Sequence, residues 1–399
     1  MSTHFSPFSK EDLIPQEEKL EIQKQKDEFF IGLPKETFFE ERRICLTPDA
    51  VSAMTQNGHR IVVESGAGEY ANFTDKNYSD AGAKIVYNSK DVFSCSMILK
   101  IAPPSLTEIS YMKPETLLVS SLQIKTQSKE YFEALSKKKI SAIAFDYIKD
   151  SEGMYPIVQS LSEIAGTASV LIAAETMSNQ NLGNGLLFGN IGGVPPAEVV
   201  IIGAGTVGLF AAKSAIGLGA SVKVFDNSIS KLRRLQQNIS SPIFTSTLQP
   251  RTLQKALMRC DVCIGAIRGK SRSPIVVTDE LVQIMKPGAV IVDVSIDHGG
   301  CIETSEITTH SHPTFTKYDV IHYCVPNIPS RYARTATISI SNIFTPFLIH
   351  IAEEGGFECA MKRERILRSG MYMYHGILTN KAVSDWFHIP YKDINLLIL

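Results

Sequence analysis

This 399-residue sequence has no excess of charge of either sign. The chain has 40 lysines and arginines against 41 aspartates and glutamates, so its formal net charge is −1. This balance provides no electrostatic basis for binding nucleic acid or an anionic membrane. The first ten residues lack the basic and apolar regions of a signal peptide. The apolar stretch 338–351 is interrupted by polar residues and is expected to be too short to span a bilayer. We therefore expect a cytoplasmic protein with neither nucleic acid nor membrane as partner.

Cysteine is also infrequent and shows no disulfide framework. The 7 cysteines lie mostly in apolar, strand-like runs, which is typical of buried thiols in a reducing compartment. Cys260 and Cys263 form a C-x-x-C pair, but no second pair of ligands follows at a comparable spacing. We expect a structural role for this pair and no metal site.

The most specific motif present lies between two apolar runs, residues 199–202 and 221–225. It consists of Gly203-Ala204-Gly205-Thr206-Val207-Gly208, a helix-like segment that follows, and Asp226 at the end of the second run. In a dinucleotide-binding βαβ unit such glycines allow a tight turn, approach of the pyrophosphate and close helix packing, and the helix N-terminus binds the anion. The aspartate, about twenty residues on, accepts the ribose hydroxyls and would repel a 2′-phosphate. A glycine-rich turn without a ligand is the simpler alternative, but the flanking patterns favour NAD binding, and NAD over NADP.

Short apolar runs alternate with helix-like segments along most of the chain, which is long enough for two domains. Residues 30–157 lack the glycine motif and are expected to form the substrate domain, whereas residues 158–333 form the NAD-binding domain. After residue 333 the pattern is helical, without predicted strands, so residues 334–399 should pack back on the first domain. Residues 1–29 are predicted to form a helical extension. The predicted fold is α/β, with two Rossmann-like parallel-sheet domains, an interdomain cleft and a discontinuous first domain.

The carboxyl ends of the predicted strands provide candidate ligand contacts, because ligands of open α/β sheets bind there. In the second domain this rule selects the turn Gly265-Ala266-Ile267, Asp297 and Asn327. Asp297 precedes two glycines, which leave its surroundings open to a cofactor or substrate. A solvated aspartate at a strand end is an equally good interpretation from spacing alone.

Two cations in the first domain are suited to holding a carboxylate. Arg43 lies between a predicted strand and a helix that Thr47 and Pro48 begin, and Lys100 ends an apolar run. Arginine binds a carboxylate through paired hydrogen bonds, and lysine can add a point charge. Taken singly, each is also compatible with a solvated surface charge, and Arg42 is an alternative to Arg43.

Several motifs in the same order resemble those of the alanine dehydrogenase/pyridine nucleotide transhydrogenase family. They are Gly32-Leu-Pro-Lys-Glu36, Arg43-Ile-Cys-Leu-Thr-Pro48, Glu64-Ser-Gly-Ala-Gly68, Met97-Ile-Leu-Lys100, Ser162-Glu-Ile-Ala-Gly166, Gly192-Gly-Val-Pro-Pro196, Asp293-Val-Ser-Ile-Asp297-His-Gly-Gly-Cys301 and His322-Tyr-Cys-Val-Pro-Asn327. The resemblance covers roughly residues 30–380. It is closer to the alanine dehydrogenases, because residues 155–162 replace the R-A-Q-x-M-D-A loop of the transhydrogenases.

The resemblance implies NAD-dependent oxidative deamination of a small L-amino acid, best matched by L-alanine, to the keto acid and ammonium. It implies that Arg43 and Lys100 hold the substrate carboxylate and keto oxygen, with Asn327 as a further contact, and that Asp297 is a catalytic carboxylate. The residues it places along the cofactor or substrate are Ser162, Asp226, Val325, Asn327 and Ile328. It also implies a homo-oligomer, a hexamer or a dimer, whose ligand is a small amino acid or keto acid.

Gln123 departs from the family pattern, because it stands where the family has a catalytic histidine. We assign Gln123 to the catalytic group with Asp297 and Lys100, although a glutamine cannot exchange a proton near neutral pH. His298, beside Asp297, is a candidate replacement. Two alternatives therefore stay open: a saccharopine- or opine-type imine reductase on the same scaffold, and an NAD(H)-binding protein that has lost catalysis.

Overall fold

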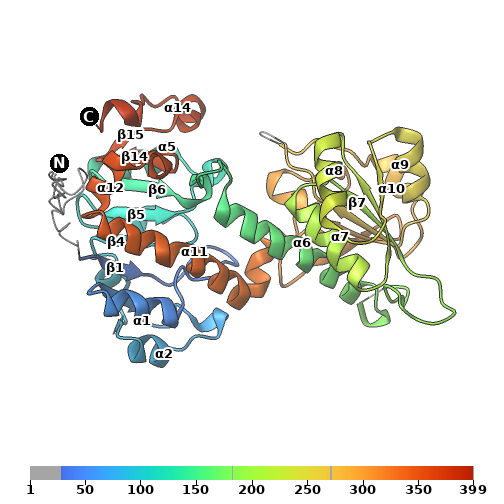
Figure 1. Ribbon diagram of the computed structural model, residues 1–399, viewed down its shortest axis with the longest axis horizontal. Helices are drawn as coiled ribbons and strands as arrows, with labels where there is room; N and C mark the ends of the chain where they lie inside the picture. The colour runs from blue at the N-terminus through green and yellow to red at the C-terminus, as the bar shows by residue number, and fades with distance from the viewer. Residues whose placement is uncertain (1–27, 182, 270–271, 399) are drawn as a thin grey trace, which may run out of the picture.

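The computed structural model describes residues 28–181, 183–269 and 272–398. The predicted extension over residues 1–29 falls almost entirely outside the described residues. Figure 1 shows two lobes, each with its own sheet and helices, and two long helices between them, α6 (Pro156–Thr176) and α11 (Ala333–Glu353). The architecture is α/β with two domains, as predicted.

The first lobe contains an eight-stranded sheet in the order β15-β14-β6-β5-β4-β1-β2-β3. Its strands are β1 (Phe30–Leu33), β2 (Arg60–Glu64), β3 (Lys84–Val86), β4 (Met97–Leu99), β5 (Leu117–Ser120), β6 (Ser141–Ala144), β14 (Met371–Tyr374) and β15 (Ile377–Leu378). The first six strands pair in parallel in a doubly wound order. The helices of this lobe before α6 are α1 (Pro48–Gln56), α2 (Asp75–Asp80), α3 (Ser89–Val92), α4 (Leu106–Tyr111) and α5 (Lys129–Lys137), with 3-10 turns η1 (Glu69–Ala71), η2 (Ile124–Thr126) and η3 (Phe145–Tyr147).

The second lobe contains a seven-stranded sheet in the order β12-β13-β11-β10-β7-β8-β9. Its strands are β7 (Glu198–Ile202), β8 (Ser221–Phe225), β9 (Phe244–Ser246), β10 (Val262–Gly265), β11 (Val290–Asp293), β12 (Thr314–Lys317) and β13 (Val320–Tyr323). Among the described strands of this sheet, β12 alone pairs antiparallel, at one edge. The helices are α7 (Thr206–Gly217), α8 (Ile229–Asn238), α9 (Pro250–Leu257) and α10 (Asp279–Gln283), with 3-10 turns η4 (Asn179–Asn181), η5 (Val294–His298) and η6 (Ile328–Tyr332).

The C-terminal part of the chain returns to the first lobe, as predicted, but the expectation that it has no strands is wrong. β14 pairs antiparallel with β6, and β15 pairs with β14, so they extend the edge of the first sheet. Runs of four and two residues are too short to show an alternating pattern, and the pairing of β14 with β6 depends on the tertiary fold. The remaining elements are α12 (Phe357–Arg363), α13 (Arg365–Arg368), α14 (Lys381–Phe387) and η7 (Ile394–Leu396).

Helix α6 joins the two lobes because its apolar residues belong to both cores. Ile157 near its start packs in the core of the first sheet, whereas Ala168 and Ile172 pack in that of the second. Gly166 lets α6 approach α7 closely, since a Cβ there would lie 2.4 Å from the Val207 carbonyl oxygen. The helix begins at Pro156, a residue suited to the first helical turn.

Helix α11 is longer than the apolar stretch noted in the sequence and packs on the first lobe. It spans 21 residues, and Ile340, Phe344 and Leu348 are buried in the core of the first sheet. By length and composition alone, α6 and the stretch Ile328–Glu353 would each suffice to cross a membrane. In the structure both present apolar faces to the protein cores.

Candidate active site

The glycine turn after β7 has the backbone geometry that its sequence predicts. Gly203 has φ +116°, and a Cβ there would lie 2.4 Å from the carbonyl oxygen of Ala266. A Cβ on Gly208 would lie 1.9 Å from the carbonyl oxygen of Gly203, so the helix approaches the strand more closely than an alanine allows. A Cβ at Gly205 would have no described atom within 4 Å, and within the described residues no side chain caps α7. The start of α7, with Thr206 and Val207 in its first turn, is therefore open to an anion.

Asp226 lies directly after β8, where its carboxylate is held by backbone donors. Its Oδ2 accepts a hydrogen bond of 2.8 Å from the N–H of Ala204 in the glycine turn, and its Oδ1 accepts one of 2.7 Å from the N–H of Ser228. The residue is 6% exposed. Each carboxylate oxygen can accept a further hydrogen bond, so Asp226 orders the turn and still has acceptor capacity for ribose hydroxyls.

The end of β10 lies beside the glycine turn. The N–H of Ala266 donates to the carbonyl of Ile202, at 2.7 Å, and the Ala266 carbonyl faces Gly203. A Cβ on Gly265 would lie 2.7 Å from Oδ1 of Asp293 and from Sγ of Cys301, which accounts for glycine at this position. The structure thus brings the predicted cofactor turn 203–208 together with the predicted contacts 265–267.

Other predicted cofactor residues are more enclosed. Val325 is 0% and Ile328 2% exposed, and both pack in the core of the second lobe. Only their backbone groups are available to a ligand. Ser162 lies on α6, where its hydroxyl donates to the Val158 carbonyl at 2.6 Å.

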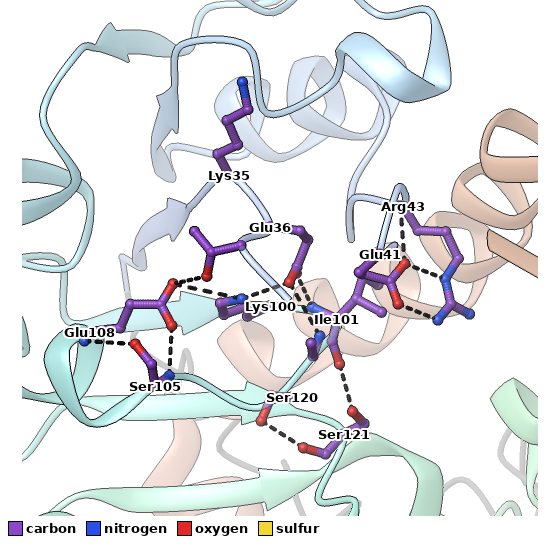
Figure 2. Close-up of polar contacts among 12 residues, drawn as sticks. Lys35, Glu36, Glu41, Arg43, Lys100, Ile101, Ser105, Glu108, Ser120 and Ser121 are labelled. Carbon is purple, nitrogen blue, oxygen red and sulfur yellow. Dashed lines mark hydrogen bonds and ion pairs between the residues drawn. The ribbon is translucent and has the colours of Figure 1, made fainter. Parts of the chain in front are cut away.

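Arg43, in the loop after β1, is buried in contact with a carboxylate of its own loop. Its Nε and Nη2 donate to Oε1 and Oε2 of Glu41 at 2.7 and 2.6 Å (Figure 2). Burial favours the protonated form of Glu41, but the guanidinium outweighs it and the pKa of Glu41 is lowered. The same pair keeps Arg43 charged in spite of its burial. Arg42 is also cationic, but only its backbone N–H is bonded into the junction, to Ser330 Oγ at 3.0 Å.

Lys100, directly after β4, is 1% exposed and lies between two carboxylates (Figure 2). Its Nζ donates to Oε2 of Glu36 at 2.6 Å and lies 3.7 Å from Oε1 of Glu108. Burial lowers the pKa of Lys100, but its interactions with Glu36 and Glu108 outweigh burial and raise it. For Glu36 the balance is the reverse: burial raises its pKa to about 7, although Lys100 opposes this. Lys100 is therefore a cation near neutral pH, and Glu36 titrates there.

Asp297 extends from η5, which follows β11, and is exposed at the junction of the two lobes. Its Oδ1 accepts a hydrogen bond of 2.9 Å from the N–H of Asn327. Protein atoms around the carboxyl reduce its hydration and raise its pKa, while the Asn327 N–H and the charge of Arg43 act in the opposite direction. Asp297 from the second lobe thus interacts electrostatically with Arg43 from the first.

Gln123, which the resemblance sets at the position of a histidine, lies after β5 in a left-handed conformation, with φ 45° and ψ 56°. Its Nε2 donates to Ser121 Oγ at 3.2 Å, and that hydroxyl donates to the Ile101 carbonyl at 2.7 Å, next to Lys100. Burial and the nearby cations Arg268 and Lys125 lower the pKa of His298 to about 4. His298 is therefore neutral near pH 7 and is a weaker base than an ordinary histidine.

Four carboxylates of this region were not singled out as site residues from the sequence. They are Glu36, Glu41, Glu108 and Asp146. Burial raises the pKa of Asp146 to about 6, and its Oδ1 accepts from the N–H of Leu122 at 3.3 Å, beside Gln123. Glu36 lies in a quoted motif, but its pairing with Lys100 joins residues 64 positions apart. No spacing rule for single elements could have revealed that contact.

Comparisons with known proteins match both domains of the chain. The family model for the alanine dehydrogenase/PNT N-terminal domain matches residues 32–165, and that for the C-terminal domain matches residues 169–381. An alanine dehydrogenase of Mycolicibacterium smegmatis is 36% identical over 91% of this chain and 98% of its own length. One of Staphylococcus epidermidis is 37% identical over the same shares.

Solved structures give the same result for the fold. A structure of an L-alanine dehydrogenase superposes with a TM-score of 0.85 at 35% identity, covering 90% of this chain and 99% of the other. A transhydrogenase from Sinorhizobium meliloti superposes with a TM-score of 0.76 over 88% of this chain and 99% of its own, but at 22% identity it shows only a shared fold.

Proposed function

The chain belongs to the alanine dehydrogenase/PNT family, and from this premise we propose that it catalyses the NAD-dependent oxidative deamination of L-alanine to pyruvate and ammonium, and the reverse reaction. The observation that carries the proposal is the meeting of two groups from different lobes. Asn327 of the second lobe donates its backbone N–H to Asp297, a carboxylate suited to proton transfer, and its side-chain amide to Glu41, which holds Arg43, a cation suited to a carboxylate.

The second lobe has the residues that NAD requires. The open start of α7 suits the pyrophosphate, the turns 203–208 and 265–267 suit the nucleotide, and Asp226 suits the adenosine ribose. When bound, NAD⁺ supplies the acceptor for the hydride that leaves the substrate Cα. We expect NAD rather than NADP because the Asp226 carboxylate would repel a 2′-phosphate.

The residues of the first lobe bind and orient the substrate. Glu41 occupies Nε and one amino group of Arg43, and among the described residues no hydrogen bond engages Nη1, which we assign to the substrate carboxylate. Lys100 provides an ammonium for the oxygen that develops on the reacting carbon. Holding both groups of the substrate in this way can lower the barrier by about 7–11 kcal/mol.

Asp297 is the group we assign to proton transfer. Its raised pKa favours a carboxyl that can take a proton from attacking water and return it to the leaving amine. Gln123 lacks an exchangeable charge and can only donate or accept a hydrogen bond to the substrate oxygen. The proton route therefore runs through Asp297, with Lys100 or a bound water assisting.

The protein is also proposed to act as a homo-oligomer. The loop before β7 exposes Leu187 (73%), Val194 (58%) and Ile191 (49%), a local concentration of apolar side chains that subunit contact would cover. Light scattering on the purified protein would give the number of subunits, and a monomer at micromolar concentration would contradict this part of the proposal.

The function is tested by mixing the purified protein with NAD⁺ and L-alanine at alkaline pH and following the absorbance band of NADH. We expect turnover with L-alanine and weaker turnover with larger amino acids. Keto acids mixed with lysine or ornithine and NADH test for an imine reductase, which would be favoured by oxidation of NADH only in these mixtures. Binding of NADH without turnover of any substrate would show that catalysis has been lost.

A further inference from the structure

Glu41 occupies a central position in the junction, although its sequence context does not distinguish it from its neighbours. The residue is 3% exposed, and its Oε1 accepts from the backbone N–H groups of Arg42 and Arg43, both at 3.1 Å. The same carboxylate binds the guanidinium of Arg43 through two hydrogen bonds. The side chain thereby fixes both the course of its own loop and the plane of the guanidinium (Figure 2).

Asn327 of the second lobe contacts Glu41 on one side and Asp297 on the other. Its Nδ2 donates to Oε2 of Glu41 at 2.9 Å, and its backbone N–H donates to Oδ1 of Asp297 at 2.9 Å. Asn327 has φ 55° and ψ 46°, a left-handed conformation that asparagine tolerates better than most residues. One residue thus connects the carboxylates of both lobes.

The loop around Glu41 is attached to the second lobe by further hydrogen bonds. Ser330 Oγ donates to the Glu40 carbonyl at 2.6 Å and accepts from the N–H of Arg42 at 3.0 Å. The N–H of His310 donates to Oε1 of Glu40 at 2.7 Å. These bonds set the loop against η6, so the contact between Glu41 and Asn327 has a defined geometry.

We propose that Glu41 is a positioning residue that orients Arg43 and, through Asn327, couples this substrate-binding guanidinium to the carboxylate of Asp297 in the other domain. The proposal rests on the proposed function, because Arg43 and Asp297 act on one substrate only if the chain is an amino-acid dehydrogenase. Hydrogen bonds join Arg43 to Glu41, Glu41 to Asn327 and Asn327 to Asp297 without a gap. A change at Glu41 therefore alters the relative placement of the two groups that must contact the substrate together.

The test is a double-mutant cycle on Glu41→Gln and Asn327→Gly. Glutamine keeps the size of Glu41 but removes its charge and one of its acceptor oxygens. Glycine adopts the left-handed conformation of Asn327 without strain and removes only the side-chain amide. The matched controls are Glu69→Gln, an exposed glutamate of the same domain, and Asn72→Gly, an exposed asparagine with φ 57°.

We expect Glu41→Gln to raise KM for L-alanine about tenfold or more, with an unchanged dissociation constant for NADH. Asn327→Gly should also raise KM. The KM of the double variant should not exceed that of the single variant with the higher KM, because both changes remove the same contact. The controls should match the wild type. An unchanged KM in Glu41→Gln, or effects of the two changes that multiply independently, would overturn the proposal.

The same four proteins should be compared in thermal unfolding, which needs no substrate. Coupling across the lobes predicts that the shifts of the two single variants are not additive in the double variant. Additive shifts would refute the bridge even if the enzyme is active. Absence of turnover in the wild type, together with non-additive shifts, would instead refute the proposed function and the positioning role while leaving the contact between the lobes established.

Discussion

Replacement of Glu36 by glutamine tests the charge balance around Lys100. The Glu36 carboxylate accepts from Lys100 Nζ and from the Ile101 N–H, each at 2.6 Å, and the side chain is 6% exposed. Burial raises the pKa of Glu36 from 4.5 to about 7 against the opposing effect of Lys100. Glutamine has the same size and does not titrate, so the side chain at position 36 should change its protonation with pH only in the wild type.

The sign follows from proton linkage. Because the pKa of Glu36 is higher in the folded than in the unfolded chain, the folded chain binds the proton more tightly. This contribution to stability is complete below the unfolded value of 4.5 and is lost as the pH rises through about 7. One pKa unit corresponds to about 1.4 kcal/mol, so the shift amounts to roughly 3 kcal/mol. Relative to Glu36→Gln, the wild type should lose stability of that order across this range.

The measurement is urea unfolding of both proteins, followed by circular dichroism, at several values from about pH 5 to about pH 8. At each pH the unfolding free energy of Glu36→Gln is subtracted from that of the wild type. The change of this difference with pH does not contain the pH-independent effect of losing the ion pair. Glu69→Gln is the control, because Glu69 is 68% exposed and lies 3.8 Å from Lys35. A difference that stays constant with pH, or one that grows in favour of the wild type as the pH rises, would refute the reasoning.

Three further changes probe the cofactor turn and the proton route. Gly208→Ala places a Cβ 1.9 Å from the Gly203 carbonyl oxygen, an overlap whose relief costs about 1–3 kcal/mol. Fluorescence titration should show that the variant binds NADH about tenfold more weakly or worse. Gly217→Ala at the end of the same helix meets no described atom within 4 Å and should leave binding unchanged. Asp226→Ser should reduce the preference for NAD over NADP by at least about tenfold in kcat/KM, since it removes a carboxylate that disfavours a 2′-phosphate; an unchanged ratio would exclude Asp226 as the determinant. Gln123→His should add to the pH profile of kcat an ionisation near pH 6.5, roughly the ordinary value for histidine, and an unaltered profile would show that position 123 takes no part in proton transfer.

Local sequence patterns were sufficient for the principal elements of both sheets. The apolar run 221–225 forms β8 with those bounds, and the run 199–202 lies within β7 (Glu198–Ile202). Helix α1 begins where Thr47 and Pro48 predict it, with Thr47 accepting from the Ala50 N–H at 3.3 Å. In these cases a buried apolar run, or a capping residue with its own backbone partner, determines the structure within a few residues.

The short strands at or beside the edges of the sheets could not be predicted in this way. β3, β9, β14 and β15 have three, three, four and two residues. Such segments show no period, and hydrogen bonds to a neighbouring strand stabilise them, which for β14 is the distant strand β6. The discontinuity of the first domain was predicted from the helical pattern after residue 333, although the absence of strands expected there was wrong.

For the site, Arg43 lies in the loop between β1 and α1, whereas the sequence by itself determined the backbone of the glycine turn and the positions of Lys100, Asp297 and Asn327 in segments that follow strands. These depend on local geometry, since a parallel sheet directs all its carboxyl ends to one edge. The tertiary structure alone decided which carboxylates face these cations and what protonation they have. Glu36 reaches Lys100, and Glu41 reaches Asn327, across 64 and 286 positions of sequence. Their pKa values follow from burial and from charges brought together only by folding, which no local pattern encodes.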